Sequence, residues 1–136
     1  MSEQLHRILI VEQDDLIRPL AAEWLNAAGY DVDTVAAAEE AGTGHNGVAV
    51  PQTDLIVVDL PAPRAGGAAT VRLLQRFHPG VPIVATSACF LTGIGGCMDA
   101  AGRLGVVGVL AKPYSREQLL SSVQHALADG FTARRG

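Results

Sequence analysis

The stretch ILIVEQDDLIR, residues 8–18, passes directly from an apolar run to a group of acids. The apolar run is continuous rather than alternating, which is typical of a strand whose two faces are both covered by helices. Glu12, Asp14 and Asp15 follow it, with Gln13 set among them. The stretch therefore predicts a central strand of a parallel sheet with acidic side chains at its carboxyl end.

Outside this stretch, short β-branched runs alternate with Ala- and Leu-rich segments that repeat at helical spacing. Such alternation is typical of βαβ units around a parallel sheet. We therefore predict an α/β fold, a single doubly wound sheet of five parallel strands with helices on both faces. Strands are expected over residues 7–11, 30–36, 53–60, 81–87 and 106–111, and helices over 14–29, 36–41 (weak), 68–77, 88–105 (short or frayed) and 115–130.

The first and last predicted helices each carry an apolar face. The first is expected to end at Gly29, and its buried face to consist of Leu16, Leu20, Trp24, Leu25 and Ala28. The last is expected to begin with a Ser115 cap, and its buried face to consist of Leu119, Leu120, Val123 and Leu127.

Length and composition fit one compact domain over residues 1–136, of which 49% are apolar and 18% charged. The formal net charge of -4 provides no basic field for nucleic acid, so we expect no direct nucleic-acid binding. Neither Cys89 nor Cys97 belongs to a C-x-x-C pair, and no segment approaches the length of a membrane span. We expect a cytoplasmic protein without a membrane anchor.

Polar side chains follow four of the predicted strands. They are Glu12, Gln13 and Asp14 after the first strand, Asp59 at the end of the third, Thr86 and Ser87 at the end of the fourth, and Lys112 and Pro113 after the fifth. In an open parallel sheet these ends meet at one edge, where ligands bind. Clustered carboxylates there favour a divalent cation such as Mg²⁺, and an ionised aspartate can serve as a nucleophile toward phosphoryl groups.

Several motifs in this order resemble the receiver domain of two-component response regulators, the CheY-like family. They are ILIVEQDDLIR, DLIVVDLPAP with Gly67 downstream, VPIVATSA, and GVLAKPY before an amphipathic helix, and they span the chain from Arg7 to about Ala128. The resemblance implies a flavodoxin-like sheet of strand order 2-1-3-4-5. It also implies a core over about residues 6–128, followed by a C-terminal tail over 129–136.

The resemblance implies a role for each matching residue. Asp59 would accept a phosphoryl group from a phosphohistidine on a sensor histidine kinase or phosphotransfer protein. Ser87 would bind the phosphoryl oxygens, and Lys112 would pair with them. Mg²⁺ would be held by Glu12, by position 13, by Asp59 and by the backbone carbonyl of Pro61. Pro113 would follow a cis peptide bond.

Several positions depart from the family pattern. Gln13 replaces the second acidic residue, so the pocket loses one negative charge, and we expect weaker Mg²⁺ binding and slower phosphorylation. Asp14 could compensate by turning inward, or it could simply cap the first helix. Val109 stands where the family commonly has a switch aromatic. Ala62 and the glycine-rich segment 89–105 also differ from the usual pattern.

Three functions remain open from the sequence. The chain is expected to be a phosphorylatable receiver, a signalling domain rather than an enzyme, that acts on a separate effector, alone or as a homodimer. Gln13 and Val109 instead favour a degenerate pseudo-receiver that binds proteins without phosphorylation. A small phosphatase with an aspartyl intermediate is disfavoured, because such enzymes usually carry a second aspartate where this chain has Pro61.

Overall fold

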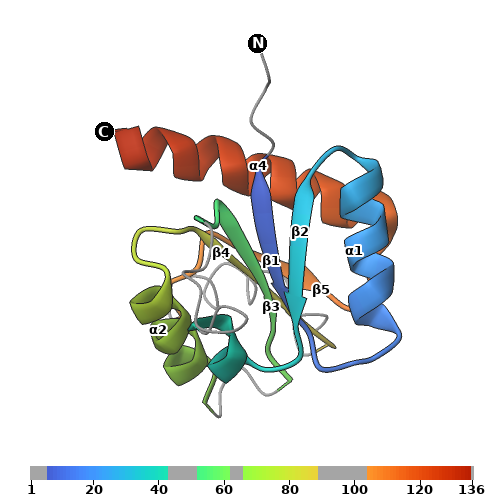
Figure 1. The fold of residues 1–136 in the computed structure, drawn as a ribbon, viewed down its shortest axis with the longest axis horizontal. Helices are drawn as coiled ribbons and strands as arrows, with labels where there is room; N and C mark the ends of the chain where they lie inside the picture. The colour runs from blue at the N-terminus through green and yellow to red at the C-terminus, as the bar shows by residue number, and fades with distance from the viewer. Residues whose placement is uncertain (1–5, 43–51, 62–65, 89–103, 136) are drawn as a thin grey trace.

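The computed structural model describes residues 6–42, 52–61, 66–88 and 104–135. Its five strands form one parallel sheet in the order β2-β1-β3-β4-β5, as predicted (Figure 1). The strands are β1 (Arg7–Val11), β2 (Asp31–Val35), β3 (Leu55–Asp59), β4 (Ile83–Ser87) and β5 (Gly108–Ala111). Because β1 and β3 are neighbours at the centre, Glu12 and Asp59 leave the sheet side by side.

The helices follow the predicted order. They are α1 (Ile17–Ala27), the short 3-10 helix η1 (Ala38–Gly42), α2 (Ala68–Phe77) and α4 (Arg116–Arg135). The weak helix predicted over 36–41 is thus a single 3-10 segment, and α4 continues beyond the predicted end at residue 130. The remaining predicted helix, over 88–105, and Ala62 fall mostly or wholly outside the described residues.

The sheet separates two apolar cores. On one face, side chains such as Leu9, Ile56 and Val58 pack against α2 and η1. On the other, Ile8 and Val57 belong to a core to which α1 and α4 contribute (Figure 1). Because alternate residues of each central strand enter opposite cores, the strands are apolar throughout, which explains the continuous run in residues 8–11.

The predicted buried face of α1 is partly wrong. Leu25 is fully buried as expected, but its buried partner is Ala21, one turn before it. Leu16 precedes the helix and is 82% exposed, while Leu20 is 43% exposed. Leu16, Leu20, Trp24 and Ala28 follow one another at intervals of four, and this row lies about 100° around the helix from the row that contains Ala21 and Leu25. The row with Ala21 and Leu25 faces the sheet, whereas the row with Leu16, Leu20 and Ala28 is exposed apart from the partly buried Trp24.

The local signals at helix ends are confirmed. The Ser115 hydroxyl accepts a hydrogen bond from the Gln118 amide (3.1 Å), and the Gln118 side chain accepts one from the Ser115 amide (2.8 Å), which forms a capping box. Gly29 follows α1 with φ +99°, a left-handed conformation that favours glycine. Leu119 and Val123 are buried on α4 as predicted, with Leu120 and Leu127 partly buried, and Ala126 joins them.

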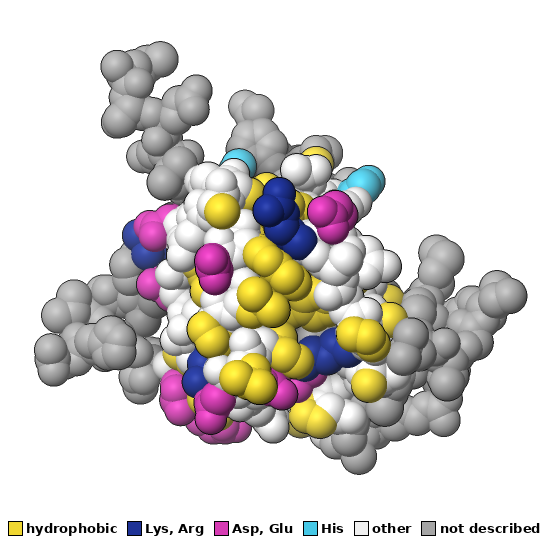
Figure 2. Space-filling view, turned by 90° about the vertical axis from the view of Figure 1, so that its right-hand side faces the viewer, with side chains coloured by type: hydrophobic (Ala, Val, Ile, Leu, Met, Phe, Trp, Pro, Cys, Tyr) yellow, Lys and Arg dark blue, Asp and Glu magenta, His cyan; other side chains and the backbone are white. Residues whose placement is uncertain are grey.

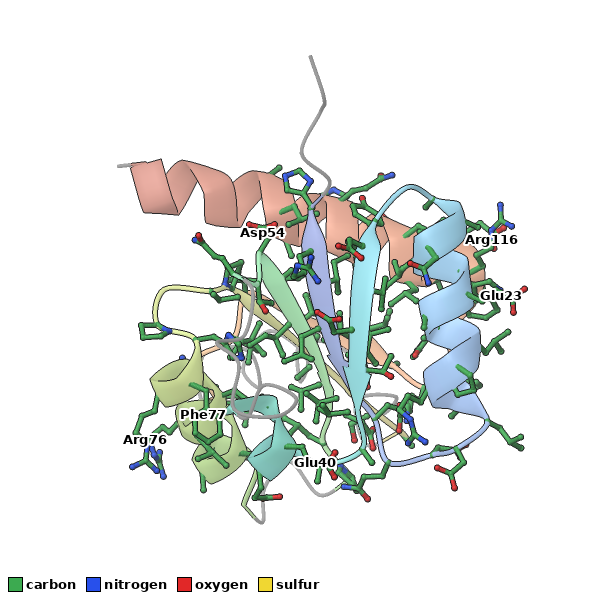
Figure 3. The ribbon with its side chains drawn as sticks, in the orientation of Figure 1. Glu23, Glu40, Asp54, Arg76, Phe77 and Arg116 are labelled. Carbon is green, nitrogen blue, oxygen red and sulfur yellow. The ribbon has the colours of Figure 1, made fainter. Side chains whose placement is uncertain are left out.

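Arg7 forms ion pairs and a hydrogen bond with three aspartates near the amino ends of the strands. The Arg7 guanidinium pairs with Asp31 (2.7 Å) and Asp33 (3.0 Å) on the neighbouring strand. The Arg7 amide also donates to the Asp54 carboxylate (2.8 Å). Figure 3 shows Asp54 at the opposite end of the sheet from Glu40, which lies near the carboxyl ends of the strands. The three aspartates are therefore structural and remote from the predicted site.

Candidate functional site

The predicted site residues lie at the carboxyl edge of the sheet. Glu12 directly follows β1, Asp59 is the last residue of β3, Ser87 is the last of β4, and Lys112 directly follows β5. Since all strands are parallel, the four positions share one edge. The topology thus gathers residues that are far apart in the sequence.

A single ammonium group joins the two buried carboxylates. Lys112 Nζ lies 2.7 Å from Glu12 Oε1 and 2.9 Å from Asp59 Oδ1. The side chains are nearly enclosed, with 14%, 4% and 10% of the Lys112, Glu12 and Asp59 side chains exposed. The ammonium of Lys112 thus lies between the two carboxylates and bridges them.

Lys112 is the only lysine of the sequence. Burial lowers its pKa, but hydrogen bonds and charge interactions with Glu12 and Asp59 outweigh burial, so its pKa is raised from the ordinary 10.5. The peptide bond between Lys112 and Pro113 is cis, as predicted. Tyr114 comes next, and burial, with the negative charge of Glu12 and Asp59, raises its pKa to about 12. The lysine is therefore positively charged throughout the physiological range of pH.

Asp14 is used as a helix cap. Its Oδ1 accepts hydrogen bonds from the amides of Leu16 (2.8 Å) and Ile17 (3.0 Å). These bonds, that to Ile17 first, lower the pKa of Asp14 below the ordinary 3.8. The Asp14 amide donates in turn to Glu12 Oε2 (3.2 Å). Of the two roles open from the sequence, capping is therefore the one the side chain performs, and it faces the helix rather than Asp59.

A cavity of about 290 Å³ opens beside Asp59. Gln13 and Pro61, the two remaining predicted ligands, line it together with Asp59. A carboxylate, an amide side chain and a backbone carbonyl are all hard oxygen donors, so this set fits Mg²⁺. Among the described residues no three Asp, Glu, His or Cys side chains form a metal-binding group, and position 13 contributes an amide rather than a carboxylate. The pocket therefore suits a hard cation, but it offers less negative charge than a pocket with an acid at position 13.

Ser87 lies at the same edge, where its backbone carbonyl is hydrogen-bonded to the Lys112 amide. The register places Thr86 opposite Asp59, and Ser87 one residue further, opposite Ala111. Ser87 is buried, and its carbonyl accepts a hydrogen bond from the Lys112 amide (3.1 Å). Val109, at the position of the switch aromatic, packs against the core on the α2 face. The backbones of Ser87 and Lys112, the predicted hydroxyl and lysine of the site, are thus directly hydrogen-bonded.

The sequence of residues 8–124 matches the response regulator receiver domain family. The chain belongs to this family. Receiver domains are signalling modules of two-component systems rather than classical enzymes, and phosphorylation-dependent switching is their standard role. They bind Mg²⁺ in their acidic pocket, and they interact with histidine kinases or phosphotransfer proteins and with effector domains.

Similar proteins include longer regulators and single receivers. This receiver is 29% identical over 135 residues to the transcriptional regulatory protein GlrR of Escherichia coli, matching 98% of the chain but 29% of GlrR. It is 31% identical over 127 residues to PdtaR of Mycobacterium tuberculosis, matching 90% of the chain and 57% of PdtaR. The receiver therefore spans between about a third and about half of these curated relatives.

Solved structures confirm the fold. The chemotaxis response regulator CheY4 of Vibrio cholerae has a TM-score of 0.71 at 22% identity, covering 90% of this receiver and 99% of that chain. NtrX of Brucella abortus, solved in complex with ADP, has a TM-score of 0.75 at 25% identity, covering 97% of this receiver and 29% of that chain. Within the described part of the receiver, no helix combines the length and apolar character that a membrane crossing requires.

Two residues in or beside this site were missed in the sequence. Arg18, in the first turn of α1, donates from its guanidinium to the carbonyl oxygen of Glu12 (2.8 Å). A signal was available, because a cation at a helix N-terminus opposes the helix dipole and so usually has another partner. Tyr114 was missed as well, since its contact with Trp24, an edge-on ring pair at 6.5 Å, depends on how α1 meets the start of α4.

Proposed function

We propose that this receiver accepts a phosphoryl group on Asp59. The observation that carries the proposal is the pairing of Asp59 Oδ1 with Lys112, beside a cavity that Asp59 itself lines. Lys112 holds one carboxylate oxygen and leaves Oδ2 as the nucleophile. The cavity supplies space for the incoming phosphoryl group.

In the transfer, Oδ2 attacks phosphorus while the P–N bond to the donor histidine breaks. The electron pair of that bond remains on the imidazole, and a new O–P bond forms on Asp59. Lys112 then pairs with a phosphoryl oxygen while it keeps its contact with Asp59 Oδ1, and the Ser87 hydroxyl donates to another phosphoryl oxygen. The receiver thus takes part in its own phosphorylation and, with water as the acceptor, in its own dephosphorylation.

Asp59, Gln13 and the Pro61 carbonyl would hold Mg²⁺, with Glu12 behind them. When bound, the cation neutralises charge on the transferring phosphoryl group. Gln13 contributes an oxygen but no charge, so we propose that the receiver binds Mg²⁺ more weakly than one with an acid at this position. Phosphorylation is correspondingly slower and needs more Mg²⁺.

Engagement of Ser87 and Lys112 by the phosphoryl group would shift a population between two conformers. Because the Ser87 carbonyl accepts a hydrogen bond from the Lys112 amide, we expect the two residues to move together at the ends of β4 and β5. Val109 provides no aromatic relay, so the altered surface is expected to be this end of β4 and β5 itself. A separate effector protein in the cytoplasm would read that surface.

The donor protein is expected to dock on an exposed apolar band over α1 and the start of α4. The band consists of Leu16, Leu20, Trp24, Tyr114 and Leu120, of which the first two are exposed and the others half-buried. Figure 2 shows hydrophobic side chains gathered across this face. α1 begins at the same edge as Asp59, so a kinase or phosphotransfer protein seated there can bring its phosphohistidine to the cavity.

A pseudo-receiver that binds partners without phosphorylation is the second candidate. Gln13 favours it, because a neutral side chain at this position offers a cation less attraction than a carboxylate. Lys112 also already supplies a positive charge to Glu12 and Asp59. In that case the apolar band would bind its partner whatever the state of Asp59. The two candidates differ in one observable, the chemical modification of Asp59.

Intact-mass measurement after incubation with phosphoramidate decides between them. The receiver is incubated with Mg²⁺ or with a chelator, and Asp59→Asn is the control. We expect a phosphoryl adduct that requires Mg²⁺ and is missing in the variant. If no adduct forms even at high Mg²⁺ concentration, the phosphorylatable receiver is excluded and the pseudo-receiver stands.

A further inference from the structure

We infer that Arg18 is a positioning residue that sets the geometry of Glu12 and Gln13, two of the residues expected to hold Mg²⁺. The inference rests on the proposed function, and it assigns a role to a side chain that is not itself a ligand. Arg18 lies on α1, whereas Glu12 and Gln13 lie on the loop between β1 and α1. The guanidinium therefore acts on the pocket through the backbone of this loop.

Arg18 contacts the loop at three points. Nη1 donates to the carbonyl oxygen of Glu12 (2.8 Å), Nη2 pairs with Asp15 Oδ1 (2.6 Å), and the Arg18 amide donates to the carbonyl oxygen of Asp14 (3.0 Å). Only 22% of the Arg18 side chain is exposed. The Asp15 side chain is 87% exposed, so the bond to the Glu12 carbonyl is the contact that holds the covered guanidinium in a defined geometry.

The carbonyl that Arg18 binds belongs to the peptide that joins Glu12 to Gln13. The amide of Glu12 is already fixed, because it donates to the Val35 carbonyl (3.1 Å). With its carbonyl held by Arg18, Glu12 is anchored to β2 on one side and to α1 on the other. Glu12 can then direct its carboxylate to Lys112 and to the Asp14 amide, while Gln13 faces the cavity.

The nature of Gln13 makes this anchor more important than it would be for an acid. A glutamine side chain has one more rotatable bond than aspartate, and so it loses more rotamer entropy when it is held in one geometry. It also has no charge to attract a cation from a distance. Its oxygen is useful only when the backbone already points it at the cavity, and Arg18 provides that orientation.

The position of the Arg18 charge is unfavourable for the helix, which suggests that the side chain has another role. Arg18 occupies the first turn of α1, where the helix dipole disfavours positive charge. Its charge also lies near the pocket and by itself would repel Mg²⁺. Positioning and repulsion therefore predict opposite results when Arg18 is removed, because loss of positioning weakens cation binding and loss of repulsion strengthens it.

The test compares Arg18→Ala and Arg18→Lys with Arg76→Ala as the matched control. Arg76 is exposed near the end of α2, away from α1 (Figure 3). Amide exchange at Asp14, Leu16 and Ile17 is measured by NMR, since these amides donate to side chains of the loop. In Arg18→Ala their exchange is expected to rise about tenfold while exchange in the middle of α1 stays unchanged.

Mg²⁺ is then titrated in two ways, by amide chemical shifts and by the rate of Asp59 modification with phosphoramidate. For Arg18→Ala we expect the Mg²⁺ midpoint to rise about tenfold, as is typical when a residue that orients a ligand is lost. The rate at saturating Mg²⁺ should stay within about twofold, since the attacking group is unchanged. Arg18→Lys should restore part of the midpoint, and Arg76→Ala should match the wild type.

A lower midpoint in Arg18→Ala would overturn the inference in favour of charge repulsion. Faster loop exchange with an unchanged midpoint would also overturn it, because Arg18 would then be merely structural. A wild-type receiver that shows neither Mg²⁺-dependent shifts nor an adduct would overturn the proposed function and the inference together. The wild type alone therefore reports on the first, and the variants report on the second.

Discussion

Lys112 Nζ lies 2.9 Å from Asp59 Oδ1, although β5 and β3 are not neighbours in the sheet. β4 lies between them, and the four-carbon stem of lysine spans its end. The same ammonium reaches Glu12 on the far side of Asp59. The resting site is thus a three-residue ion cluster with one net negative charge.

The pKa of Lys112 can be measured directly because the chain has no other lysine. Reductive methylation with ¹³C-formaldehyde labels its amine and the N-terminal amine, which differ in chemical shift. NMR titration is expected to give a pKa above that of an exposed dimethyl-lysine, because Glu12 and Asp59 stabilise the charged form. Glu12→Gln should lower it, since burial remains while one partner is lost. A value at or below the exposed reference would contradict the ion cluster.

Restoring the missing carboxylate should strengthen cation binding. In Gln13→Asp we expect Mg²⁺ affinity to increase about tenfold or more, since a charged ligand replaces a neutral one in the same cavity. Calorimetric titration of the unphosphorylated receiver measures this. Gln13→Asn is the matched control, because it has the length of aspartate without its charge. Equal affinities of the two variants would show that side-chain length, not charge, limits binding.

Two leucines at the start and the end of α1 should respond differently to truncation. Leu25→Ala removes a fully buried side chain and is expected to lower the free energy of unfolding by about 2–5 kcal/mol. Leu16→Ala changes a side chain that is 82% exposed and should stay within about 0.5 kcal/mol. Urea denaturation measures both. Similar losses in the two variants would mean that the row with Leu16 is buried after all.

Stability in alkali should depend on Tyr114. Its pKa is raised from 10.0 to about 12, so the folded chain keeps the phenol proton over a range in which the unfolded chain releases it. The free energy of unfolding therefore falls as pH rises from about 10 to about 12. With allowance for partial exposure we expect this contribution to be about 1–2 kcal/mol.

Tyr114→Phe removes this part of the loss. Denaturant unfolding at pH 8 and at pH 11 is expected to show a smaller decrease for the variant than for the wild type. Lys112 also has a raised pKa and loses its stabilising charge in alkali, but it is present in both proteins, so it cancels in the comparison. Identical decreases would show that the Tyr114 hydroxyl is not held in a buried environment.

Local features were predictable from the sequence because they depend on neighbours along the chain. The bounds of α2 agree with the predicted helix over 68–77. Ser115 caps α4 as predicted, in a capping box with Gln118 three residues later. The strand pattern identified the parallel sheet, since a strand buried on both faces must be apolar throughout. The ends of those strands then indicated Asp59 and Lys112 as site residues.

Tertiary structure decided what depends on distant segments. The row of α1 that faces the sheet, with Ala21 and Leu25 buried, is set by how the helix packs on the sheet. The link from Lys112 to Glu12 joins residues a hundred positions apart in the chain. Such a contact is set by strand order, and short-range patterns in a sequence carry no distance between strand ends.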